Sequence, residues 1–153
     1  MEMIFDVFKN PFIITAVCSW IVVQFCKGMI HFAVYKEFDI KRFFGDGGMP
    51  SAHAATVSSL ATASGIYYGL ASFQFAVCTI LAIIVCRDAV GVRMETGKQA
   101  KIINDLRDYV LEIGKGEVDD TKLKEFVGHT PLQVVVGFIV GMITAIVISL
   151  ILL

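Results

Sequence analysis

The sequence predicts an all-α integral membrane protein, a single domain over residues 1–153 with about four membrane-spanning helices. Composition is the first reason: 56% of the 153 residues are hydrophobic and 18% are charged, whereas soluble domains carry about 25% charged residues. The second is that the apolar residues gather in runs close to the roughly 20 residues that a span requires. This balance disfavours a soluble single-domain enzyme and excludes a disordered chain.

Four apolar segments are the expected spans: residues 11–30, 50–69, 71–89 and 131–153. The first is expected to be retained, because no basic segment of the signal-peptide kind precedes it. Near its end, Lys27 is expected to snorkel to the interface. The second span is rich in small residues, which let helix backbones approach closely in lipid. The cysteines lie inside the apolar runs and are expected to be reduced structural thiols.

Two polar stretches, residues 31–49 and 90–130, hold ten of the 13 lysines and arginines. With four spans both stretches lie on one side of the membrane, and the positive-inside rule makes that side cytoplasmic. Within the second stretch, apolar residues at three-and-four spacing over 98–113 predict an amphipathic helix. Two placements are open for this helix: it lies on the membrane surface, or it packs over the mouth of the bundle.

Two histidines are the best candidates for chemistry, because each lies beside the start of a span on the basic side. His53 follows a glycine turn and Pro50, at a helix start whose amides favour an anion such as phosphate. His129 directly precedes Thr130 and Pro131, where the last span begins. One ring could attack phosphorus while the other gives a proton to the leaving oxygen. The net charge of −1 argues against a nucleic-acid partner.

These segments resemble two motifs of the type-2 phosphatidic acid phosphatase and vanadium haloperoxidase superfamily, and the chain is similar to a small divergent branch of it. The tetrapeptide from Pro50 to His53 resembles Pro-Ser-Gly-His. The segment from His129 to Gly141 resembles His-x3-Asp-Val-x2-Gly-x3-Gly. The resemblance implies that His129 is the nucleophile, forming a phosphohistidine, and that His53 is the general acid and then the base. It also implies a phosphate cradle at Ser51 and the Ala52 amide, with no metal and no cofactor.

The sequence departs from the family at three places. Its Lys-x6-Arg-Pro motif is missing, and the basic residues in that region are Lys36, Lys41 and Arg42. The last motif lacks its usual Ser-Arg, and Arg87 and Arg93 are the substitutes considered for the phosphate clamp; as arginines at a span end they also fit snorkelling anchors.

Gln133 replaces the acid that orients the nucleophilic ring, and an amide cannot stabilise an imidazolium as a carboxylate does. Asp88 is the candidate to supply that charge. Gly137 and Gly141 fit either packing within the chain or a homo-oligomer interface.

The function expected from these residues is metal-independent hydrolysis of a lipid phosphate or diphosphate at the cytoplasmic face of a multi-pass membrane protein. Lipid is the expected substrate class because a site at the interface meets head groups while the tail stays in the bilayer. The alternative is a catalytically degenerate member that binds anionic lipid head groups, or a small transporter. A haloperoxidase is disfavoured because the chain has no soluble domain around the site.

Overall fold

The computed structural model describes residues 2–36, 48–114, 121–125 and 128–153, and within these residues the secondary structure is entirely helical. The helices are α1 (Glu2–Phe8), α2 (Pro11–Tyr35), α3 (Ala52–Tyr68), α4 (Phe73–Val90), α5 (Val92–Glu112) and α6 (Pro131–Leu152). The predicted all-α fold is therefore confirmed, with α2 extending past the expected end of the first span.

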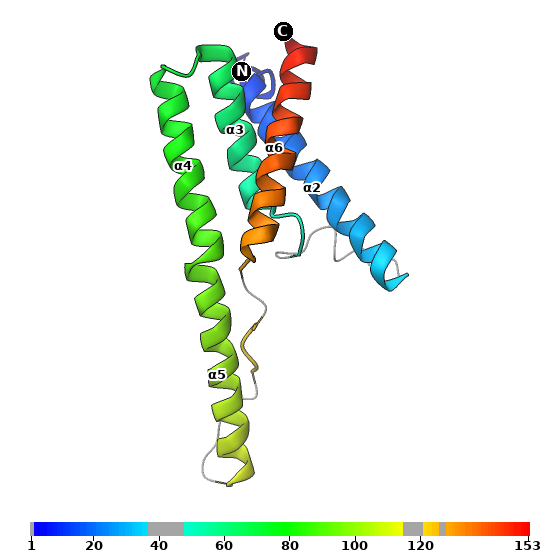
Figure 1. Ribbon diagram of the computed structural model, residues 1–153, viewed down its shortest axis with the longest axis vertical. Coiled ribbons are helices and arrows are strands. Elements are labelled where there is room, and N and C mark those ends of the chain that lie inside the picture. Colours follow the sequence, from blue (N-terminus) through cyan, green and yellow to red (C-terminus); the bar gives the residue numbers. More distant parts are fainter. Residues whose placement is uncertain (1, 37–47, 115–120, 126–127) are drawn as a thin grey trace.

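The helix α3 lies at the centre of the bundle and contacts α2, α4 and α6 (Figure 1). Among the described residues, α2, the α4 part of the continuous stretch Phe73–Glu112, and α6 are long and apolar enough to cross a membrane. The central α3 has only 17 residues, or about 25 Å at the usual rise. Its small residues suit a helix that is surrounded by protein rather than by lipid.

The contact between α3 and α6 is close because two glycines of α6 face the α3 backbone. A Cβ atom at Gly137 would overlap the Ser51 carbonyl, and one at Gly141 would overlap the Ala55 carbonyl and the Ser58 hydroxyl. The Ser58 hydroxyl also donates to the Phe138 carbonyl across the interface, at 2.9 Å. These glycines therefore serve packing within the chain, the first of the two roles expected for them.

Each bundle helix begins with a polar side chain that accepts hydrogen bonds from the first turn, as N-cap residues do. Asn10 caps α2, Ser51 caps α3, Ser72 caps α4 and Thr130 caps α6. A proline follows the cap in α2 and α6, where its missing N–H is not needed. The turns between spans thus fix where each helix starts.

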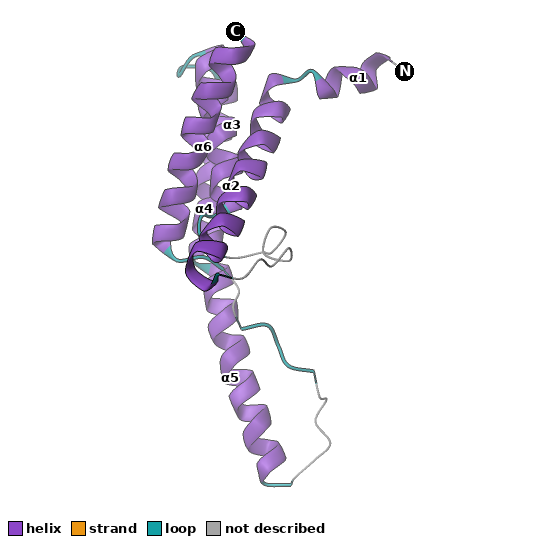
Figure 2. Ribbon diagram, turned by 90° about the vertical axis from the view of Figure 1, so that its right-hand side faces the viewer, coloured by secondary structure: helices purple, strands orange, loops and turns teal. Residues whose placement is uncertain are grey.

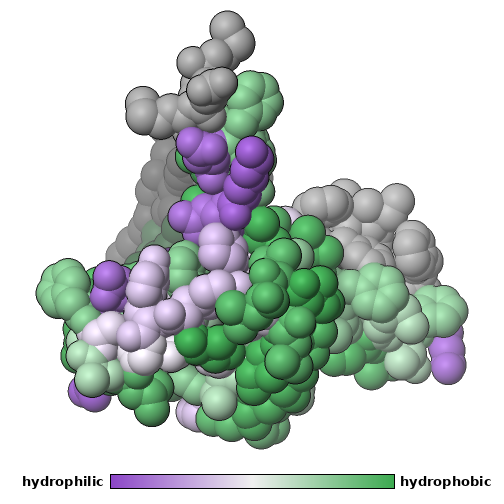
Figure 3. Space-filling model, turned by 90° about the horizontal axis from the view of Figure 1, so that it is seen from above, coloured by the Kyte–Doolittle hydropathy of each residue, from purple (hydrophilic) through white to green (hydrophobic). Residues whose placement is uncertain are grey.

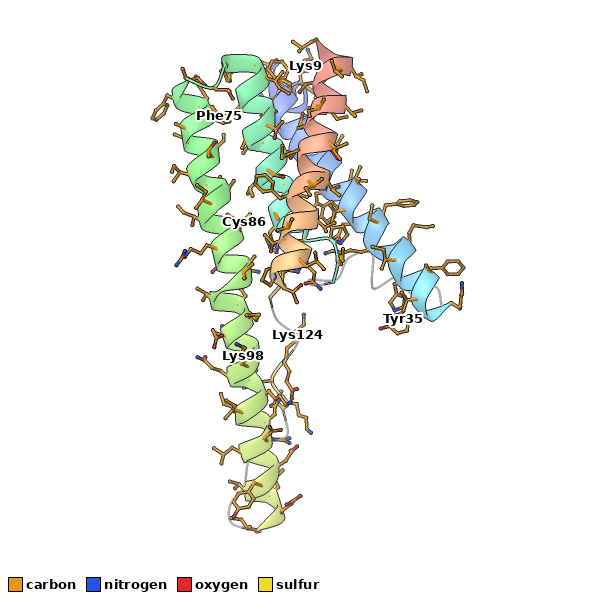
Figure 4. All side chains as sticks on the ribbon, viewed as in Figure 1. Lys9, Tyr35, Phe75, Cys86, Lys98 and Lys124 are labelled. Atoms are coloured by element: carbon orange, nitrogen blue, oxygen red, sulfur yellow. The ribbon has the colours of Figure 1, made fainter. Side chains whose placement is uncertain are left out.

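The two ends of the bundle differ in polarity. Both chain ends and the 69–72 turn lie at one end (Figure 1), with Lys9 there (Figure 4), and that end is largely hydrophobic in the space-filling view (Figure 3). Lys98 and Lys124 lie beyond the other end (Figure 4). The described residues thus have the sidedness that the sequence predicts, with the charged segments at one end.

The helix α5 follows α4 in nearly the same direction, so that the two form one rod that extends beyond the bundle (Figures 1 and 2). Gly91 ends α4 and begins α5. The amphipathic helix exists as predicted, but it runs along the axis of α4, not across the mouth of the bundle. Apolar periodicity defines which face of a helix is apolar and says nothing about the direction of its axis.

Candidate functional site

The structure brings His53 and His129 together at the charged end of the bundle. Their ring centroids are 6.1 Å apart and the ring planes are inclined by 58°. His53 lies in the first turn of α3 and is half-buried, while His129 precedes α6 and is 4% exposed. At this separation one small group, such as a phosphoryl group, can come within about 3 Å of both rings.

The loop that carries His129 is attached to the junction of α4 and α5. The His129 N–H donates to the Ala89 carbonyl at 3.0 Å. This carbonyl lies in the last turn of α4, where carbonyls lack a partner within the helix. Gly128 has a φ of +92°, and a Cβ there would lie 2.6 Å from the Met94 nitrogen in α5. Glycine is thus required, because the loop both turns left-handed and contacts the α5 backbone.

Gln133 determines which nitrogen of the His129 ring carries the proton. Its Oε1 accepts from the Thr130 N–H at 3.0 Å, which identifies this atom as the amide oxygen. The same oxygen lies 3.3 Å from His129 Nδ1. An amide oxygen only accepts, so Nδ1 carries the proton and Nε2 keeps its lone pair in the neutral ring. Gln133 thereby does part of the work of the expected carboxylate, without its charge.

Burial lowers the pKa of His129 below its ordinary value of 6.5. The hydrogen bond to Gln133 acts in the opposite direction, and the positive charges of Lys27, His53 and Arg93 lower the pKa further. An uncharged ring is the form that can attack phosphorus. The surroundings of His129 therefore favour the nucleophilic form near neutral pH.

Lys27 is the residue whose place the sequence interpretation got wrong. Its side chain does not snorkel to the interface: the residue is 7% exposed, and its positive charge lowers the pKa of His129. α2 continues for two more turns beyond Lys27, so the lysine is not at the helix end.

A signal for this location was present in the sequence. Thr15, Ser19, Val23 and Lys27 recur every four residues, so they lie along one stripe of α2. Ser19 donates to the Ala55 carbonyl of α3 at 3.1 Å, and Val23 packs against Ala52 and Ala55. The polar residues in this stripe mark the face of α2 that turns inward.

The expected phosphate cradle lies at the start of α3, beside the first turn of α6. Ser51 is fully buried, and its Oγ accepts from the Ala54 N–H at 3.4 Å. Its own N–H donates to the Gln133 carbonyl at 3.0 Å. That amide is therefore already used, and the positive end of the α3 dipole and the Ala52 region are what could receive an anion.

The other basic candidates are spread over several places. Arg93 acts on His129 and also pairs with Asp88, with 3.0 Å between Nε and Oδ2; Asp88 thus lies against an arginine rather than in the place of Gln133. Arg87 is exposed on α4. Lys36 ends α2, which leans away from the bundle there (Figure 1). Lys41 and Arg42 lie outside the described residues.

Across the described residues, no group of three or more His, Cys, Asp and Glu side chains could hold a metal ion. The candidate site consists of two imidazoles, a buried lysine, an arginine and the start of a helix. Such a set is suited to binding a phosphate and transferring it through nitrogen.

The chain is similar to a known membrane protein and to a protein family. A relative from Bacillus subtilis (strain 168), described as the uncharacterized membrane protein YuiD, is 33% identical over 153 residues, covering 94% of this chain and 97% of the relative. No solved structure matches. The sequence profile of the Divergent PAP2 family matches residues 8–144. The chain therefore belongs to the Divergent PAP2 family of membrane proteins.

Proposed function

We propose that this protein is a phosphatase that removes phosphate from a lipid phosphate or diphosphate at the cytoplasmic face of the membrane. One observation carries the proposal: the His53 and His129 rings lie 6.1 Å apart. The contact with Gln133 favours the His129 tautomer whose lone pair is on Nε2. Family membership supports the phosphatase class, and the position of the site at the charged end of the bundle supports a substrate with its tail in lipid.

The reaction follows from the geometry in two steps. In the first, His129 Nε2 attacks phosphorus, the bond from phosphorus to the ester oxygen breaks, and protonated His53 gives its proton to that oxygen. In the second, neutral His53 takes a proton from a water molecule, which attacks the phosphohistidine and releases inorganic phosphate. Lys27 and Arg93 balance the negative charge that builds on the phosphoryl oxygens in both steps.

The test is phosphate release by the purified full-length chain in lipid nanodiscs. The panel contains phosphatidic acid, phosphatidylglycerol phosphate and a polyprenyl diphosphate, with glycerol phosphate as the water-soluble comparison and a chelator present throughout. We expect release from at least one lipid, inhibition by vanadate, and no turnover in His129→Ala. His31→Ala is the control, because His31 lies about one turn before the end of α2 and its ring contacts Tyr35 instead.

A second readout identifies the intermediate. With a phosphate-labelled lipid, wild-type protein quenched during turnover should carry an acid-labile label on His129, and His129→Ala should carry none. Turnover at the wild-type rate in His129→Ala would rule out the mechanism. Lipid-phosphate binding without release in any form would instead favour a protein that binds anionic head groups, the alternative suggested by the uncharged Gln133.

A further inference from the structure

A short segment that precedes Gly128 and His129 in the sequence is hydrogen-bonded to α5. Residues 121–125, here called the strap, run beside α5 and lead toward Gly128 and His129 (Figures 1 and 2). Asn104 of α5 contacts the strap through both ends of its amide. Its Nδ2 donates to the Leu123 carbonyl at 2.9 Å and to Glu125 Oε1 at 2.7 Å, and its Oδ1 accepts from the Leu123 N–H at 2.9 Å.

These three hydrogen bonds join the strap to α5 through a buried side chain. Asn104 is 4% exposed, so water does not readily replace the bonds it makes. The strap has a second contact, in which Lys122 Nζ lies 3.0 Å from Asp108 Oδ2, but both side chains are about half exposed or more. Exposed ion pairs of this kind contribute little.

The asparagine is not explained by the needs of the helix that contains it. Asparagine is a poorer helix former than alanine in the middle of a helix, and Asn104 lies well inside α5. The cost of Asn104 to the stability of α5 is offset by the hydrogen bonds that its side chain makes to the strap. The strap is an irregular backbone segment, and the Leu123 N–H and carbonyl need partners because no helix or sheet supplies them.

We propose that Asn104 is a positioning residue for His129: by fixing the strap on α5, it keeps the His129 ring buried and facing His53. The proposal rests on the proposed function in taking His129 as the nucleophile. Asn104 touches neither the ring nor the phosphate. It acts through the strap, together with the His129 N–H bond to Ala89 and the contact of Gly128 with α5.

The first test measures the position of the ring without relying on catalysis. The wild-type chain, Asn104→Ala and Asn104→Asp are treated with diethyl pyrocarbonate, and labelling of each histidine is followed by mass spectrometry. We expect His129 to label about tenfold faster in both variants. Each buried hydrogen bond that is lost favours conformations in which the strap leaves α5 and the His129 ring becomes accessible. His31 and His53 should label at wild-type rates.

The two variants separate a positioning role from a folding role. Alanine favours the helix, so circular dichroism should show α5 intact in Asn104→Ala. Asn104→Asp keeps the shape and the acceptor for Leu123 but removes both donors and places a carboxylate beside Glu125. Gln99→Ala is the matched control, since Gln99 is an exposed amide on the same helix, and it should behave as wild type.

The second test is turnover of the lipid that the wild-type chain hydrolyses. We expect kcat to fall about 100-fold in the Asn104 variants, as for displaced catalytic groups, with KM nearly unchanged because Lys27 and Ser51 stay in place. Unchanged His129 labelling, or equal faster labelling of all three histidines, overturns the proposal. If His129 labelling rises but no variant and not even the wild type releases phosphate, the proposed function fails and the positioning role stands.

Discussion

His53 belongs to a helix wedged among three others, whereas His129 belongs to a loop tied to the α4–α5 rod. The position of His53 follows from close packing, in which Gly137 and Gly141 of α6 lie against the α3 backbone. Close packing of this kind leaves few alternative arrangements, because added volume has nowhere to go. The position of His53 is thus fixed by the shape of the bundle.

The position of His129 follows from individual hydrogen bonds instead. Its N–H is held by Ala89, its ring by Gln133, and the strap before it by Asn104. Segments held this way open locally at a lower free-energy cost than a packed core. The comparison teaches that the two halves of the site are held by different kinds of contact, and the five predictions below test these contacts and the groups beside them.

The largest effect is expected at Lys27, which lies on α2 and takes part neither in the packing that fixes His53 nor in the hydrogen bonds just described for His129. In Lys27→Met we expect kcat/KM to fall by about 100- to 1000-fold, as when a group that stabilises transition-state charge is removed. The pKa of His129 should rise, because a positive charge that lowers it is gone, and the acidic limb of the pH–rate profile should move to higher pH. Lys9→Met, at the opposite end of the bundle (Figure 4), is the control; equal activity in both variants contradicts the assignment.

The second prediction disturbs only the close packing of α6 on α3. Gly137→Ala places a methyl group against the Ser51 backbone, and we expect a loss of about 1–3 kcal/mol in the free energy of unfolding, as for overpacked cores. Denaturant unfolding in detergent micelles measures this loss. Val135→Ala is the control, since Val135 is 54% exposed on the same helix. Equal stability of the two variants would mean that α3 and α6 are not closely packed.

The third prediction concerns Gln133, which touches both supports: its carbonyl accepts from Ser51 and its side chain faces His129. Gln133→Glu keeps the shape and adds a negative charge, which raises the pKa of His129 by stabilising the charged ring. At neutral pH we expect activity to be preserved or raised, with the acidic limb of the profile moved to higher pH. A Gln133→Glu protein without activity, beside an active wild type, would show that the added charge disrupts the site.

The wild-type pH dependence has a definite sign. Because the pKa of His129 is lower in the folded protein than its ordinary 6.5, the unfolded chain binds more protons as the pH falls below that value. Stability from this residue is thus complete above pH 6.5 and is lost as the pH falls through the folded-state pKa. Activity should fall over the same range, since the protonated ring cannot attack.

The smallest effect is expected at Ser58, whose hydroxyl donates to the Phe138 carbonyl between α3 and α6. In Ser58→Ala the free energy of unfolding should fall by about 0.6 kcal/mol, the usual contribution of such bonds in membrane bundles. Ser59→Ala is matched to it, because the equally buried Ser59 donates to the Thr56 carbonyl within its own helix. A larger loss in Ser59→Ala than in Ser58→Ala would refute the interhelical role.

Much of this arrangement is predictable from the sequence, because its causes are local or compositional. The apolar runs give the helices, Pro11 and Pro131 mark two of their starts, and the placement of charge gives the end at which His53 and His129 meet. The features that the sequence analysis missed depend on tertiary packing. The spacing of Lys27 from Thr15 and Ser19 places these polar residues on one face of α2, but the packing of that face on α3 is what shows that the lysine is buried.

The direction of α5 and the role of Asn104 are harder to predict for a similar reason. An amphipathic pattern defines only which face of α5 is apolar, so placement on the membrane surface and placement over the mouth of the bundle fit it equally well. In the structure α5 has neither placement and continues along the axis of α4 (Figures 1 and 2). The contact of Asn104 with Leu123 joins a single side chain to irregular backbone 19 residues away. A single contact of this kind produces no periodic pattern in the sequence.

The glycines of α6 have a practical consequence for engineering. The contact between α3 and α6 depends on the absence of side chains at Gly137 and Gly141, so it leaves no space for larger residues. Enlarging interior side chains, a usual route to thermostability, would therefore fail there. Room for improvement lies instead on the outward faces of α4 and α6, where Ile84 and Ile143 are more than half exposed and substitutions meet solvent lipid or detergent. Stabilised forms for crystallisation should be sought on that outer surface.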